Sequence, residues 1–85
     1  MRNETRVAKR RRTNCAGIVR AGQKEFTVLL RDLSPTGARV RVVSVGELPE
    51  RVQLVAPMVR IDSHCIVVWR RGNDYGLHFQ APQPH

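Results

Sequence analysis

The segment DLSPTG, residues 32–37, places a carboxylate, a hydroxyl and a glycine within six positions. Asp32 is a hydrogen-bond acceptor, Ser34 is a short donor or acceptor, and Gly37 allows another group to come close. The same segment favours a type I turn, with Ser34, Pro35 and Gly37 at the first, second and fourth positions. Gly37 is then expected to be left-handed and to start the next strand with a bulge. The segment predicts a turn that could also form one wall of a ligand site.

Cations crowd the beginning of the chain. Residues 1–12 hold six Lys and Arg against one Glu, a net charge of +5, and residues 13–85 hold nine cations against six anions, a net charge of +3. A strongly basic arm on a mildly basic domain seeks an anion, such as a nucleic acid, an acidic lipid surface, a nucleotide or an acidic protein. Charge alone equally allows a solvated tail without a specific partner.

Size and composition limit the classes of protein that fit. A chain of 85 residues with 41% hydrophobic residues predicts one small folded domain. No apolar run approaches the roughly 20 residues of a membrane-spanning helix, and no apolar stretch follows the basic N-terminus as in a secretory signal. The expected location is therefore the cytoplasm.

The reactive residue types do not form a catalytic or metal-binding pattern. Cys15 and Cys65 lie far apart, and the three histidines are not spaced to complete a metal site with them. We expect both cysteines to be reduced thiols that fill apolar space. Ser34 has no base close by in sequence and no nucleophile elbow around it, so we expect no enzymatic activity, no metal and no cofactor.

Short alternating runs separated by turn residues predict six β-strands and no helix. The expected strands are residues 14–20, 25–33, 38–43, 51–56, 59–71 and 75–80. Six antiparallel strands in so short a chain predict an all-β fold, a small closed barrel. The predicted organisation is a flexible basic arm over residues 1–12, the barrel over residues 13–80 and a disordered end over residues 81–85. Alternation directs Arg39 and Arg41 outward, while Trp69, Tyr75 and Phe79 are expected to face inward.

These features together resemble the PilZ domain, a bacterial receptor module for cyclic di-GMP. That family carries an RxxxR motif just before the barrel and a (D/N)x(S/A)xxG motif some twenty to thirty residues later. Here the run RRR at residues 10–12 stands 22 residues before Asp32, and DLSPTG fills the second motif. The segment VVWRRGNDYGLHF, residues 67–79, is also family-like, and the resemblance extends from about Arg10 to Phe79.

The resemblance implies a PilZ-like six-stranded barrel that signals by binding cyclic di-GMP and engaging an effector protein. Arginine forks suit both the phosphates and the guanine edges of this ligand, and Asp32 would accept guanine N–H groups. The implied ligand-binding residues are Arg6, Arg10, Arg11, Asp32, Ser34 and Gly37. A loose arginine arm would become ordered over the bound dinucleotide.

The arginine motif has more than one possible register. Only Arg6 and Arg10, in RVAKR, are four residues apart; a register from Arg10 ends at Asn14 and one from Arg11 ends at Cys15. A broken motif would suit a PilZ-like protein-interaction module that binds no nucleotide. A third alternative is a small basic barrel that binds nucleic acid, which the presence of only four aromatic residues makes weaker.

Overall fold

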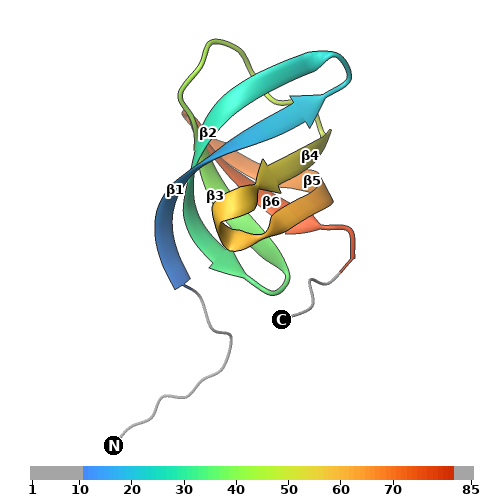
Figure 1. The fold of residues 1–85 in the computed structure, drawn as a ribbon. Helices are drawn as coiled ribbons and strands as arrows, with labels where there is room; N and C mark the ends of the chain where they lie inside the picture. Colours follow the sequence, from blue (N-terminus) through green and yellow to red (C-terminus); the bar gives the residue numbers. More distant parts are fainter. Residues whose placement is uncertain (1–10, 82–85) are drawn as a thin grey trace, which may run out of the picture.

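The computed structural model describes residues 11–81 and consists of six antiparallel strands (Figure 1). The strands are β1 Arg11–Ala21, β2 Lys24–Ser34, β3 Gly37–Val42, β4 Arg51–Ala56, β5 Ile61–Arg71 and β6 Asp74–Phe79. One short 3-10 turn, η1 Pro57–Val59, joins β4 to β5. The prediction of an all-β fold without an α-helix is confirmed for residues 11–81.

The strands close into a barrel in the order β1-β2-β3-β6-β5-β4. Closure depends on β1 and β4, which pair over the short stretch of Ile18, Val19 and Arg20. The predicted six-stranded antiparallel barrel is therefore confirmed. None of the helical segments in residues 11–81 is long and apolar enough to cross a membrane.

Alternating apolar residues fill the barrel. In β3 the side chains of Ala38, Val40 and Val42 are buried, and in β4 those of Val52, Leu54 and Ala56 are buried, as the period of two predicts. The largest fully buried side chains are Val19, Val28, Leu30, Val40, Leu54, Cys65 and Tyr75. This core holds rigid the strand ends that carry the candidate site.

Three bulges interrupt this alternation. In β1 the two residues Thr13 and Asn14 stand opposite the single residue Arg31 of β2. Arg31 is in turn the extra residue of β2 against β3, and Val68 is the extra residue of β5 against β6. A bulge changes which face the following side chains take. Asp32 therefore leaves the inward series of β2 and pairs with Arg39, which lies between buried neighbours and faces outward.

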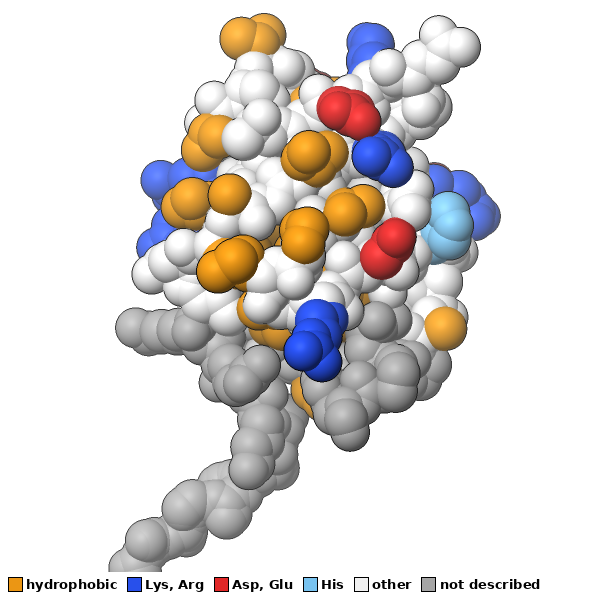
Figure 2. All heavy atoms as spheres, viewed as in Figure 1, with side chains coloured by type: hydrophobic (Ala, Val, Ile, Leu, Met, Phe, Trp, Pro, Cys, Tyr) orange, Lys and Arg blue, Asp and Glu red, His pale blue; other side chains and the backbone are white. Residues whose placement is uncertain are grey.

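The bulge at Val68 also reverses Trp69, so the expectation that this residue faces inward is wrong. Its side chain is exposed at 43%, whereas Tyr75 and Phe79 are buried as predicted. Other exposed apolar residues are scattered over the surface, and Figure 2 shows such side chains as separate spots among polar atoms and charged groups. Scattered apolar residues are ordinary, but Trp69 lies beside the site described below.

Gly37 has a different role from the one predicted. Ser34 pairs with Gly37, so the β2–β3 hairpin has a two-residue turn and no left-handed residue at position 37. A Cβ atom at Gly37 would overlap the backbone carbonyl oxygen of Leu77 in β6. Glycine is therefore needed here for the close approach of two strands, which a propensity for turns does not reveal.

Candidate functional site

One row of residues crosses the outer face of the barrel. Strand pairing places Asp32 opposite Arg39, Arg39 opposite Gly76, and Gly76 opposite Trp69. The row runs through β2, β3, β6 and β5, and cross-strand neighbours in such a row face the same side of a sheet. The bulges in β2 and β5 bring Asp32 and Trp69 into this row.

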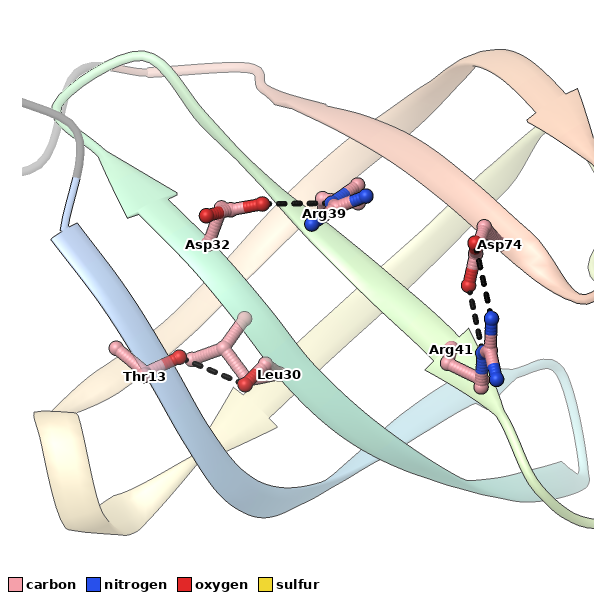
Figure 3. Close-up of polar contacts among 6 residues, drawn as sticks. All are labelled: Thr13, Leu30, Asp32, Arg39, Arg41 and Asp74. Carbon is pink, nitrogen blue, oxygen red and sulfur yellow. Dashed lines mark hydrogen bonds and ion pairs between the residues drawn. The ribbon is translucent and has the colours of Figure 1, made fainter.

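Asp32 and Arg39 form the polar part of the row. The Nε–H of Arg39 donates a hydrogen bond of 2.6 Å to Oδ2 of Asp32, and Figure 3 shows the two side chains meeting across β2 and β3. The Asp32 side chain is 10% exposed and that of Arg39 is 41% exposed. The carboxylate is thus largely covered, and the guanidinium stands at the edge of the solvent.

Trp69 forms the aromatic part of the row. A Cβ atom at Gly76 would overlap the indole ring, so the ring lies directly over this glycine. The indole fills the space where another residue would place its side chain, on the outer surface of β6. This contact fixes an exposed aromatic ring next to Arg39.

The two parts line a single open cavity of about 580 Å³. Small-molecule sites have volumes of about 300–1,000 Å³, so the cavity is large enough for a ligand. Its lining residues are Asp32, Leu33, Ser34, Ala38, Arg39, Val68, Trp69, Arg71, Gly76 and Leu77. We call this cavity the β3–β6 groove, because these two strands run beneath it. Acceptors, guanidinium groups and an aromatic face converge there.

A second ion pair lies farther along β3. Arg41 donates from Nε to Oδ1 of Asp74 at 2.9 Å and from Nη2 to Oδ2 at 3.3 Å (Figure 3). The hydrogen bond from Arg41 lowers the pKa of Asp74, partial burial raises it, and the charges of Arg41, Arg39 and Arg31 lower it further. The net direction is downward. Asp74 therefore stays ionised and offsets part of the positive charge beside the groove.

The predicted site residues fall into four groups, one of which is Gly37 alone, at the start of β3 next to the lining residue Ala38 but not itself in the groove lining. Asp32 and Ser34 line the groove, and the Ser34 hydroxyl donates to the carbonyl oxygen of Gly37 at 3.3 Å across the turn. Arg11 belongs to β1, where its backbone pairs with that of Leu33. Arg6 and Arg10 lie outside the described residues, as do most of the predicted arm and most of the predicted disordered end.

Sequence reasoning favoured an ordinary surface role for Arg39 and a packing role for Trp69 over contact with a ligand, and it did not single out Arg71; all three line the groove. Arg39 faces outward as expected, but its pairing with Asp32 depends on the bulge at Arg31. Trp69 became visible as a groove residue only through the bulge at Val68. One usable signal was Gly76, a glycine within an otherwise apolar strand, because such a glycine marks a close approach.

Within residues 11–81, no group of three or more His, Cys, Asp and Glu side chains is arranged to hold a metal ion. The groove lining contains one carboxylate, that of Asp32, which forms an ion pair with Arg39. The arrangement suits an anionic organic ligand with hydrogen-bonding edges and a flat face.

Comparison with known families supports the resemblance noted from the motifs. No curated protein matches the chain. A family model described as the PilZ domain matches residues 2–85, essentially the whole chain. With a closed six-stranded barrel and DLSPTG at the start of the row, the chain belongs to the PilZ domain family.

Proposed function

We propose that this protein is a cytoplasmic bacterial receptor for cyclic di-GMP and acts as an adaptor, not an enzyme. The observation that carries the proposal is the β3–β6 groove, which joins the DLSPTG segment to an exposed aromatic ring and two arginines. Cyclic di-GMP supplies the matching groups, two phosphates and two guanines. A guanine stacks on an aromatic face, and phosphates bind guanidinium groups.

The arginine arm would complete the site. Strand β1 pairs with β2 so that Arg11 and Arg12 are opposite Leu33 and Asp32, at the end of β2 that borders the groove. Arg6, Arg10 and Arg11 are therefore only a few residues away in sequence from the point where the chain enters the barrel beside the proposed ligand. Ordering of the arm over the dinucleotide would present a changed surface to an effector protein.

The bulge in β1 bears on the register of the arginine motif. Cys15 is partly buried and packs against the core, whereas Asn14 is exposed and has a positive φ of 134°. A second arginine at position 15 would have to enter the barrel, and one at position 14 would meet an unfavourable backbone conformation. The structure therefore favours Arg6 and Arg10 as the ligand pair.

The alternative of nucleic-acid binding has less support. A stacking surface for single-stranded nucleic acid needs several exposed aromatic rings along one face. Among residues 11–81 the aromatic side chains other than Trp69 are buried. A single ring suits one or two bases of a small ligand better than a strand.

Isothermal titration calorimetry with cyclic di-GMP tests the proposal. Separate titrations with GTP and with a DNA oligonucleotide test the two alternative ligands. We expect saturable binding of cyclic di-GMP only. The double variant Arg10→Ala/Arg11→Ala should not bind and should stay folded. Binding by the double variant equal to the parent would show that the arm has no role. A folded parent that binds none of the three ligands would favour the protein-interaction module.

A further inference from the structure

The last part of β5 has a strand neighbour on one side only. Pairing between β4 and β5 stops at Ile66, whereas β5 continues against β6 as far as Arg71. The bulge at Val68 separates the last three pairs of β5 and β6 from the rest of their ladder. These pairs, which we call the end ladder, are Trp69–Gly76, Arg70–Tyr75 and Arg71–Asp74. A short ladder beyond a bulge can open locally while the rest of the barrel stays closed.

The β3–β4 loop, residues 43–50, lies against the end ladder. Nη1 of Arg70 lies 3.2 Å from Oε1 of Glu47, and the backbone N–H of Leu48 donates to the hydroxyl oxygen of Tyr75 at 3.3 Å. We call these two contacts the loop latch. Leu48 is the only buried residue of the loop. A loop with so little buried surface depends on such contacts for its order.

Trp69 and Arg70 are neighbours in the chain, but they act on two different faces. The ring of Trp69 lies over Gly76 on the wall of the β3–β6 groove. Arg70 lies on the opposite face, where its guanidinium carbon is 5.2 Å from the centre of the Tyr75 ring. The groove lining includes neither Arg70 nor any residue of the loop. The aromatic wall and the loop latch therefore both require the same pairing of β5 with β6.

We propose that the end ladder couples the groove to the β3–β4 loop, so that a ligand in the groove orders the loop. The inference rests on the proposed function, in which cyclic di-GMP is the ligand. A base stacks on Trp69 only while the indole is held over Gly76, and the latch forms only while Arg70 stays over Tyr75. Ligand and latch thus favour the same paired state of one element, and each must strengthen the other.

The coupled loop is remote from the start of β1. Arg11 pairs with Leu33 near the end of β2, whereas the loop begins beside Thr27, whose carbonyl oxygen accepts from the N–H of Val43 at 2.9 Å. Figure 1 accordingly shows the β3–β4 connection and the beginning of β1 at opposite ends of the barrel. Through the end ladder, a ligand changes a surface that does not include the arginine arm.

Glu47→Gln cuts the ion pair of the latch without touching the groove. Glu25→Gln is the matched control, because it makes the same exchange in another exposed ion pair with an arginine. In the free protein, Glu47→Gln should increase acrylamide quenching of Trp69, since an opened end ladder exposes more of the indole. Calorimetry should show about two- to fivefold weaker binding of cyclic di-GMP by Glu47→Gln than by Glu25→Gln. Tyr75→Phe removes the other latch contact but keeps the buried ring, and it should act like Glu47→Gln.

Hydrogen exchange measured by NMR tests the coupling in the other direction. Saturating cyclic di-GMP should slow exchange of the Leu48 amide about two- to fivefold, although this amide lies outside the groove. Unchanged exchange of this amide in the saturated protein overturns the inference. So does a Glu47→Gln protein that equals Glu25→Gln in both quenching and affinity. If the parent binds no cyclic di-GMP, the proposed function fails, and quenching in the free variants still decides whether the end ladder joins the two sites.

Discussion

The indole ring of Trp69 lies across Gly76, on the outer surface of the barrel. This contact would not form in a regular strand, because the Trp69 side chain would face the core without the bulge at Val68. The contact places the chain's single tryptophan on the wall of the β3–β6 groove, with 43% of its surface exposed. Fluorescence of this residue is therefore a direct reporter of the groove.

We expect cyclic di-GMP to protect Trp69 from acrylamide quenching, because a base stacked on the indole covers its exposed face. The measurement is a Stern–Volmer titration with and without saturating ligand. Gly76→Ala is the control, since the added methyl displaces the indole and should remove both the protection and part of the affinity. Equal quenching of the free and the saturated protein would contradict a ligand in the groove.

Gly37→Ala should destabilise the barrel. The added Cβ would overlap the carbonyl oxygen of Leu77, and a backbone atom of a paired strand cannot move aside without disturbing β6. A loss of about 1–3 kcal/mol in the free energy of unfolding is expected. Urea denaturation measures it, with the exposed turn substitution Thr36→Ala as a control that should change the value by less than about 0.5 kcal/mol. An unchanged midpoint for Gly37→Ala would show that the hairpin can separate from β6.

The barrel was predictable from the sequence because its apolar residues alternate cleanly. In β3 and β4 every second residue is buried, and this pattern defines both the strands and their inward faces. Turn residues such as Pro35 mark the strand ends. The fold class follows from these local signals, since closing six short strands removes their edges.

The candidate site was only partly predictable because three bulges determine it. Their extra residues include Asn14, Arg31 and Val68, none of which is a glycine that would mark an irregular strand. Without the bulges, Asp32 and Trp69 would both point into the core. The segment DLSPTG indicated one wall of the groove, but the opposite wall and the partner of Asp32 depend on long-range register.

The Arg41–Asp74 pair should contribute stability that disappears in acid. The pKa of Asp74 is lowered from its ordinary value of 3.8, so the folded state holds the ionised form more tightly than the unfolded state does. The contribution is complete above the ordinary pKa and is lost as the pH falls through the lower folded pKa. Because Arg41 is 51% exposed, solvent screens the pair and its contribution is expected to be small.

Denaturation of the parent and Arg41→Met at pH 7 and pH 2 tests this dependence. The variant should be less stable than the parent at pH 7, and the difference should shrink toward pH 2 as Asp74 becomes protonated in the folded state. Arg20→Met removes an arginine from the more exposed pair with Glu25 and should have a smaller effect. A difference for Arg41→Met that persists at pH 2 would assign the effect to packing of the side chain.

The two cysteines should differ sharply in reactivity. Cys65 is fully buried, and burial raises the pKa of its thiol to about 11, whereas Cys15 is partly buried at the beginning of the barrel. At pH 8 only about a thousandth of Cys65 would be thiolate, even if a reagent could reach it. Labelling with a coloured disulfide reagent should detect no more than one thiol in the native protein and two in guanidinium. Cys15→Ala should abolish the native signal, and two reactive thiols in the folded protein would contradict the buried position of Cys65.

The register of the arginine motif can be decided by three substitutions measured together. Arg6→Ala should weaken binding of cyclic di-GMP about tenfold or more, because one charge-assisted hydrogen-bonding partner is lost. Cys15→Arg should not improve binding, since the side chain at this position packs against the core. Burial of an uncompensated cation there should instead lower the free energy of unfolding by about 1–3 kcal/mol. Asn14→Arg should also fail to improve binding, because a φ of 134° is unfavourable for arginine.

Calorimetry gives the affinities and urea denaturation gives the stabilities of the same samples. Tighter binding by Cys15→Arg or Asn14→Arg, with Arg6→Ala equal to the parent, would place the second arginine of the motif in β1 and reject the pair Arg6 and Arg10.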